Sequence, residues 1–130
     1  MKKAIIILSV FAVMVGAMIA ELIFVNKFYN SLQAELEVVA ESIELNESNV
    51  SNAETVALCE KVAGKWEKGK RTLLMLQNHN TVRNLDEKIV SLVEVVKSDN
   101  YNDAVIFAQS AINFVDDILL DSMPYLTNLL

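Results

Sequence analysis

The chain has 130 residues, of which 53% are hydrophobic, and a formal net charge of −6. Residues 1–27 hold three lysines and one glutamate, a net charge of +2, so the remaining residues carry −8. An outer part this acidic repels the phosphates of nucleic acid, so we expect no nucleic-acid partner. Three glycines and one proline in the whole chain indicate long helices joined by short turns.

Residues 4–25 form an almost unbroken apolar run that contains only two polar residues, Ser9 and Glu21. The apolar residues cover every face of a helix, and about 20 such residues cross the hydrocarbon of a bilayer. We therefore expect residues 1–27 to be an uncleaved signal-anchor. Two lysines precede the run and one follows it, so the positive-inside rule places the N-terminus in the cytoplasm. Residues 28–130 then lie outside the cell membrane, which makes the protein single-pass.

A cleaved signal peptide is the alternative interpretation, because Val15, Gly16 and Ala17 resemble a small-residue cleavage site. The apolar run continues past that site to Val25 without a helix breaker, which favours the uncleaved anchor. Glu21 lies near the outer end of the run. Its carboxylate either pairs with a partner's transmembrane helix or extends into the hydrated interface, and the second interpretation is the simpler one.

The first helix is expected to continue out of the membrane to Leu45, and a polar turn follows it at residues 46–51. Ser51 and Glu54 match a capping box, which predicts the start of a second helix that runs to about Asn78. Apolar residues recur every three or four positions in both helices, as on a buried face. These residues are Leu32, Leu36, Val39 and Ile43 in the first helix and Cys59, Val62, Trp66, Gly69, Leu73 and Leu76 in the second.

Two more helices are predicted, one over residues 81–98 and one that Asn102 or Asp103 caps and Pro124 ends. The third helix has one apolar stripe, whereas the fourth has two and is apolar over a wider face than one contact needs. The stripes are Val82, Leu85, Ile89, Leu92 and Val96 in the third helix, and Val105, Ala108, Ile112, Val115 and Leu119 with Phe107, Ala111, Phe114 and Ile118 in the fourth.

The expected fold class is all-α, with one N-terminal transmembrane helix that continues into an antiparallel up-down four-helix bundle. The predicted domains are the anchor, residues 1–27, and the extracytoplasmic bundle, residues 28–130. In this topology the turn at residues 77–80 and the tail from Pro124 lie near the membrane, and the other turns lie far from it. The tail residues Tyr125, Leu126, Leu129 and Leu130 then either contact the interface or a partner, or are disordered. The second and third helices alternatively form one long kinked helix.

The chain shows no catalytic motif, so we expect a protein that is not an enzyme and needs no metal or cofactor. His79 is the only histidine and has no companion at a metal-ligand spacing or nucleophile nearby, which favours a polar turn or helix-end role. The lone Cys59 lies on an apolar stripe and is expected to be buried. The second helix contains the only basic cluster, which consists of Lys61, Lys65, Lys68, Lys70 and Arg71. We interpret it as a solvated face opposite the acidic first helix, and a lipid-headgroup or nucleic-acid patch is the alternative.

Two kinds of candidate contact remain. The wide apolar face of the fourth helix, with Phe107 and Phe114, suits a protein partner. Trp66 beside Gly69 alternatively borders a small-ligand pocket between helices.

The apolar segment after two lysines, Trp66 in the second helix, His79 soon after it and the ending from Pro124 to Leu130 together resemble a bacterial family common in clostridia. Its name is domain of unknown function forty-three sixty-three. The resemblance implies a short membrane-anchored helical protein without an established activity. Genes of this family often lie beside those of YetF-like membrane proteins, which implies an accessory role.

We therefore expect an interaction protein that binds and supports an integral-membrane partner, with the bilayer contacted through residues 4–25. A homo-oligomer stays open. The alternative function is an extracytoplasmic small-ligand sensor built on the helical bundle. Scattered carboxylates such as Asp116 and Asp117 specify no reaction, because acidic residues on a helix usually form a solvated face.

Overall fold

The computed structural model describes the backbone of residues 1–129 and the side chains of residues 1–121. The helices are α1 (Lys2–Leu45), α2 (Ala53–Leu76), α3 (His79–Lys97) and α4 (Tyr101–Leu129), and the described residues contain no strand. The all-α prediction is therefore confirmed. α2 and α3 are separate helices rather than one kinked helix.

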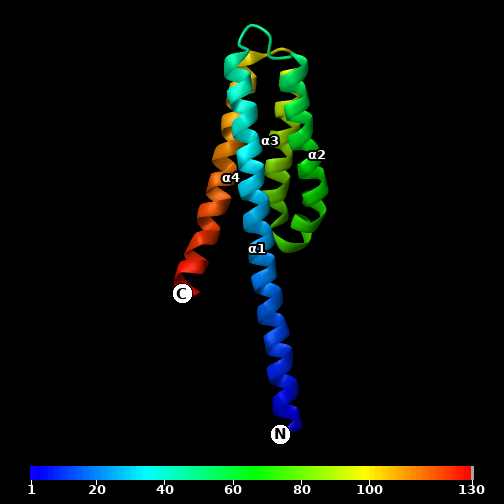
Figure 1. The fold of residues 1–130 in the computed structure, drawn as a ribbon, viewed down its shortest axis with the longest axis vertical. Helices are drawn as coiled ribbons and strands as arrows, with labels where there is room; N and C mark the ends of the chain where they lie inside the picture. The colour runs from blue at the N-terminus through cyan, green and yellow to red at the C-terminus, as the bar shows by residue number, and fades with distance from the viewer. Residues whose placement is uncertain (130) are drawn as a thin grey trace.

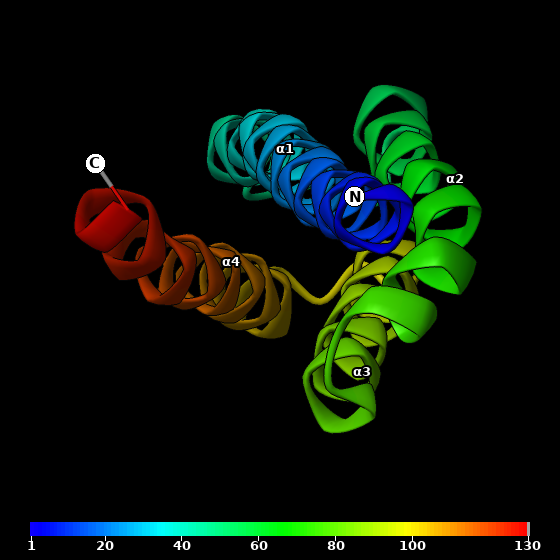
Figure 2. The ribbon, with the colours of Figure 1, turned by 90° about the horizontal axis from the view of Figure 1, so that it is seen from below.

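The helices run alternately up and down and form a four-sided bundle (Figures 1 and 2). α1 and α3 each pack against both α2 and α4, and no diagonal pair of the described helices packs together. The turn between α2 and α3 lies at the end where α1 enters the bundle, and we call this end the base (Figure 1). The other two turns lie at the opposite end, which we call the far end. This arrangement confirms the predicted antiparallel topology.

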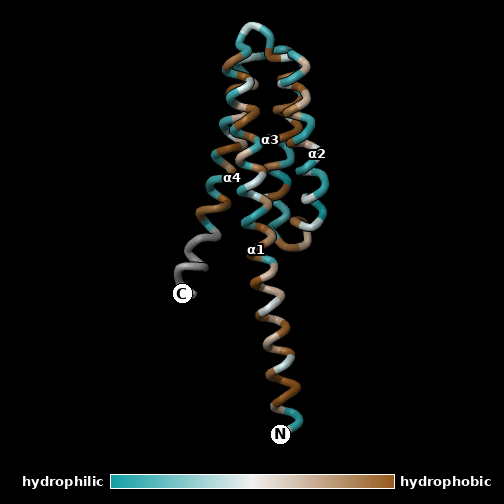
Figure 3. The backbone as a smooth tube through the Cα atoms, viewed as in Figure 1, coloured by the Kyte–Doolittle hydropathy of each residue, from teal (hydrophilic) through white to brown (hydrophobic). Residues whose placement is uncertain are grey.

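The two halves of α1 have different surroundings. Residues 1–20 are all exposed and extend beyond the bundle as a single apolar helix (Figure 3). Among the described helices, α1 alone is long and apolar enough to cross a membrane. From Tyr29 onward its apolar stripe is buried in the bundle, and the helix continues without a break to Leu45, as predicted.

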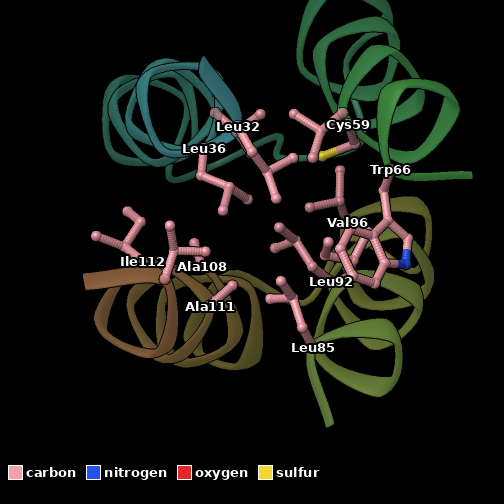
Figure 4. Close-up of a cluster of buried hydrophobic side chains, with 14 of the residues drawn as sticks. Leu32, Leu36, Cys59, Trp66, Leu85, Leu92, Val96, Ala108, Ala111 and Ile112 are labelled. Carbon is pink, nitrogen blue, oxygen red and sulfur yellow. The ribbon is translucent and has the colours of Figure 1, made fainter. Parts of the chain in front are cut away.

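The core follows the predicted stripes, and all four helices contribute to it (Figure 4). α4 supplies small residues, Ala104, Ala108 and Ala111, and its core face lies against both α1 and α3. This two-sided packing accounts for much of its wide apolar face. The buried core residues are Tyr29, Leu32, Leu36, Val39, Ile43, Val50, Cys59, Val62, Trp66, Leu73, Val82, Leu85, Ile89, Leu92, Val96, Ala104, Ala108, Ala111, Ile112, Val115 and Ile118.

The cap of α2 is Asn52 rather than the predicted Ser51. The Oδ1 atom of Asn52 accepts a hydrogen bond of 2.9 Å from the backbone amide of Thr55. The hydroxyl of Ser51 instead donates to the Asn49 side chain within the turn. The sequence Ser51–Asn52 contains two adjacent residues of good capping type, so local pattern alone does not choose between them.

The start of α4 also lies earlier than Asn102 or Asp103, the predicted caps. α4 begins at Tyr101, and the Oδ1 atom of Asn100 accepts a hydrogen bond of 3.1 Å from the Asp103 amide. The carboxylate of Asp103 in turn accepts from the Asn100 side chain at 2.8 Å. This reciprocal pair differs from a capping box, because Asp103 accepts from the side-chain amide of Asn100 and not from its backbone amide, which donates to the Val95 carbonyl.

A carboxylate joins the two turns at the far end. Asp99 has a positive φ of 56° directly after the C-cap of α3, where a residue in the left-handed region ends many helices. Its Oδ1 atom accepts hydrogen bonds from the backbone amides of Val50 at 2.8 Å and Ser51 at 3.3 Å. The turn between α1 and α2 is therefore tied to the turn between α3 and α4.

The prediction that Pro124 ends the fourth helix is wrong, because α4 continues to Leu129. Proline removes one amide donor and crowds the preceding turn, which disfavours a helix interior without forbidding it. The predicted contacts of the tail side chains, Tyr125, Leu126, Leu129 and Leu130, lie outside the side chains that the structure describes.

Candidate functional site

A surface groove between α3 and α4 contains both phenylalanines of the predicted contact face. Phe107 and Phe114 are half-buried, lie two helical turns apart on α4, and flank the core at the side that faces α3. The groove has a volume of about 310 Å³, and α3 supplies its opposite wall. The residues of that wall are Asn84, Glu87, Lys88 and Ser91.

Lys88 holds this groove in place. Its ammonium donates a hydrogen bond of 2.8 Å to the Ser110 hydroxyl on α4 and lies 5.7 Å from the centre of the Phe114 ring. Cations at this distance are attracted by the electron-rich face of an aromatic ring. α3 and α4 are thus joined across the groove by one flexible cation, and Phe114 is held with its ring partly open to solvent.

A second hollow continues from Phe114 along the outer face of α4. Its volume is about 510 Å³, and its residues include Ile106, Gln109, Asn113 and Asp117. The side chain of Ile106 is 61% exposed although isoleucine is among the most apolar residues. An exposed apolar residue beside half-buried rings and carboxamides resembles the mixed composition of a protein interface. We call Ile106, Phe107, Phe114 and Lys88 the α4 face.

The predicted pocket beside Trp66 and Gly69 is filled by another aromatic side chain. A Cβ atom added to Gly69 would lie 2.2 Å from the Cε2 atom and 2.4 Å from the Cζ atom of Phe28. The Phe28 ring also lies 6.2 Å from that of Trp66 and 5.7 Å from that of Tyr29, measured between ring centres. Gly69 thus makes room for a side chain of α1, and this part of the molecule is packed core.

The polar edge of Trp66 is satisfied inside the bundle. Its indole N–H donates a hydrogen bond of 2.8 Å to the Oδ1 atom of Asp86 on α3. The same carboxylate oxygen accepts from the Lys70 ammonium at 3.1 Å. The hydrogen bond that Lys70 donates to Asp86 is the main cause that raises the pKa of Lys70. Trp66 is 1% exposed, so both its ring and its indole N–H contribute to the packing of α2 against α3.

Glu21 and the turn that holds His79 both lie at the base, where a groove of about 300 Å³ opens at the end of the core. All four helices contribute to the groove, and two of its residues are acidic, Glu21 on α1 and Asp121 on α4. The Tyr29 hydroxyl donates a hydrogen bond of 2.6 Å to the Gln77 side chain beside it. The other residues of this groove are Leu22, Val25, Leu76, Thr81 and Ile118.

His79 is exposed and is the first residue of α3, after the cap Asn78. Its position at a helix end agrees with the predicted polar role. In the part of the chain that the structure describes, no three side chains of the His, Cys, Asp or Glu types come together as metal ligands. Cys59 is buried as predicted, and burial raises the pKa of its thiol to about 11.

The basic residues of α2 are distributed over several ion pairs. Lys65 lies 3.6 Å and Lys61 lies 3.9 Å from Glu35 on α1. Lys70 lies 3.1 Å from Asp86 on α3. The interpretation that this cluster faces the acidic surface of α1 is therefore confirmed for Lys61 and Lys65.

The sequence did not identify Ile106 and Lys88 as parts of the α4 face. Ile106 lies on neither apolar stripe of its helix, and an isolated apolar residue off the stripe is the signal that singles it out. Nothing in the sequence distinguishes Lys88 from the other lysines, and only the packing of α3 beside α4 brings it to Phe114.

Comparison with known proteins gives one match. No curated protein and no solved structure was found to match the chain. The family model described as Domain of unknown function (DUF4363) matches residues 20–129, which include the bundle and the end of the apolar run. The chain therefore belongs to the DUF4363 family.

Proposed function

We propose that this protein is a membrane-anchored accessory protein that binds another integral-membrane protein and performs no catalysis itself. Residues 4–25 are the anchor, with the N-terminus in the cytoplasm and the bundle on the outer side. The apolar run of 22 residues in an exposed helix supports the anchor. The excess of lysines before the run, two against one after it, supports the orientation.

The observation that carries the proposal is the α4 face. A packed bundle has no structural need for an isoleucine that is 61% exposed next to two half-buried phenylalanines. Aromatic and aliphatic side chains at the centre of an interface contribute most of the affinity in protein complexes. Because α1 fixes the bundle at the membrane surface, a partner at this face is expected to be a membrane protein with an outer domain or loop.

Substitution of Ile106 tests the face without disturbing the core. The full-length protein carries an affinity tag, and native membranes are crosslinked before capture and mass spectrometry. Ile106→Glu is expected to abolish capture of a reproducible membrane partner, because a charge would be buried at the contact. Val90→Glu on α3 is the matched control, since Val90 is a similarly exposed apolar residue, at 46%.

The proposal fails if the two variants capture the same proteins as the unmodified chain, or if no partner is recovered from any of them. Circular dichroism of the purified variants accompanies the capture. Equal helix content in both variants shows that a loss of partner at Ile106→Glu comes from the surface rather than from unfolding.

A small-ligand binding module is the second candidate, and the groove at the base is the observation that favours it. Pockets for small molecules have volumes of about 300–1,000 Å³, and this groove has about 300 Å³ with apolar residues from α1, α2 and α4. A ligand that binds only the folded protein raises its melting temperature. Thermal unfolding against a panel of small amphipathic amines, with Asp121→Asn as control, distinguishes this function from the first.

A further inference from the structure

We infer that the tip of the α2–α3 hairpin is a second membrane contact, which rests on lipid phosphate groups and orients the bundle. The tip consists of residues 71–83. The inference depends on the proposed function only for the anchor at residues 4–25, and it does not involve the protein partner or the α4 face.

The tip lies at the level where α1 leaves the membrane. Gln77, in the turn, accepts a hydrogen bond from Tyr29 and lines the base groove together with Leu22 and Val25. Val25 is the last residue of the apolar run. The turn therefore lies level with the outer end of the span. The headgroup region of a bilayer is several ångströms thick on each side, so a hairpin at this level reaches it without a change in the bundle.

The tip is positively charged, in contrast to the rest of the bundle. The whole chain has 17 acidic residues, yet residues 68–85 contain none and include Lys68, Lys70, Arg71 and Arg83. Lys70 pairs with Asp86, whereas Arg71 and Arg83 are exposed. Each lies about six residues from the turn, one on either helix, or about 9 Å along the helix axis. Arginine side chains extend over such distances and bind phosphate in a bidentate manner.

An exposed apolar residue carries the third step. Met75 is the second-last residue of α2, and it is 82% exposed, more than any other large apolar residue among the described side chains of residues 25–121. A methionine between two arginines matches the pattern of surfaces that insert an apolar side chain below the phosphates. Glu21 and Asp121 come from the other two helices, α1 and α4, and line the base groove together with Gln77 of the hairpin. Attraction at the hairpin and repulsion at the carboxylates therefore tilt the bundle toward the hairpin.

The depth of Met75 tests this inference in the full-length protein. Met75→Cys is labelled with a fluorophore and reconstituted into vesicles of phosphatidylcholine and phosphatidylglycerol that contain a lipid quencher just below the headgroups. Leu45→Cys is the matched control, because Leu45 is 77% exposed and lies at the far end. Cys59 is buried and is retained, and the unsubstituted chain measures any labelling at that thiol.

The expected result is strong quenching at position 75 and none above background at position 45. The double variant Arg71→Gln, Arg83→Gln removes two charges from the tip. On an anionic surface it is expected to lower the equilibrium constant for contact with the membrane about fivefold for each arginine. Lys61→Gln with Lys97→Gln removes the same charge elsewhere and is expected to leave the quenching unchanged. The inference is overturned if the label at position 75 is as accessible to an aqueous quencher as that at position 45, or if the arginine pair has no effect.

These outcomes are separate from those of the proposed function. If a partner is captured through Ile106 but the label at position 75 stays in water, the accessory role is retained and the membrane contact is overturned. A quenched label at position 75 without any captured partner supports the membrane contact and contradicts the accessory role.

Discussion

Two aromatic regions of the bundle have opposite surroundings. Phe28 and Trp66 are packed against each other at Gly69 of α2, and the indole N–H of Trp66 donates a hydrogen bond to Asp86. Phe107 and Phe114 instead line a groove, and the Lys88 ammonium lies 5.7 Å from the centre of the Phe114 ring. All four rings follow helical periodicity in the sequence. The comparison shows that the partner helix, and not the stripe itself, decides whether an aromatic residue is core or surface.

Trp66→Ala is expected to have the largest effect in this comparison. Trp66 is 1% exposed, so its removal leaves a cavity among α1, α2 and α3. Truncation of a buried tryptophan lowers the free energy of unfolding by about 3–5 kcal/mol. Chemical denaturation of the full-length protein in detergent, followed by circular dichroism, measures the change. A loss below about 1 kcal/mol, typical of a surface substitution, would show that the tryptophan is not the centre of the core.

The two glycines of α2 are expected to respond in opposite directions to alanine. At Gly69 the new methyl group would overlap the Phe28 ring, and overpacking of this kind costs about 1–3 kcal/mol. At Gly64 nothing lies within 4 Å of the added atom, so the better helix propensity of alanine stabilises by about 1 kcal/mol. The same denaturation experiment measures both. Stabilisation by Gly69→Ala would mean that Phe28 moves away freely and that this region is not close-packed.

Phe114→Ala is expected to destabilise the fold less than Trp66→Ala. The ring is half-buried, and burial of a whole phenylalanine contributes about 1.5–3 kcal/mol, so the loss is about 1 kcal/mol. Capture of the membrane partner is expected to fall more steeply, because the ring is part of the α4 face. Equal proportional losses of stability and capture in Phe107→Ala and Phe114→Ala would identify these rings as ordinary core.

The smallest effect is expected at Cys59, and it appears only at alkaline pH. Burial raises the thiol pKa from its usual 9.0 to about 11 in the folded protein. Between these values the unfolded chain releases the proton and the folded protein keeps it, so stability falls as pH rises from 9 to 11. Cys59→Ala removes this part of the pH dependence, and the difference between the two unfolding curves measures it. An identical slope in both proteins would show that the thiol is open to solvent.

The sequence predicts most of the fold, because period-3.6 stripes and scarce glycine and proline leave few alternatives to a helical bundle. The buried residues of α1 and α3 that it indicates, such as Leu36 and Ile89, are buried in the structure. Helix ends are less predictable. Adjacent residues of similar capping ability, Ser51 and Asn52, compete, and the choice depends on what the other turn offers, here Asp99.

The candidate site is less predictable than the fold, because its features arise between helices. Phe107 and Phe114 are visible in the sequence as a second stripe, but their exposure depends on how α4 is rotated against α3. Gly69 is visible as a small residue on a core stripe, whereas its neighbour Phe28 is distant in the chain. The hairpin tip combines charges from two helices, and it becomes a surface only when the topology places the turn beside Val25.

Site-specific photocrosslinking in native membranes shows whether the α4 face contacts another membrane protein. A photoreactive amino acid replaces Ile106 in the full-length protein, and the same residue at Val90 is the control. We expect a discrete crosslinked band from position 106, which contains one integral-membrane protein, and no such band from position 90. Crosslinks from position 106 only to lipid or to random proteins, as from position 90, would contradict this contact.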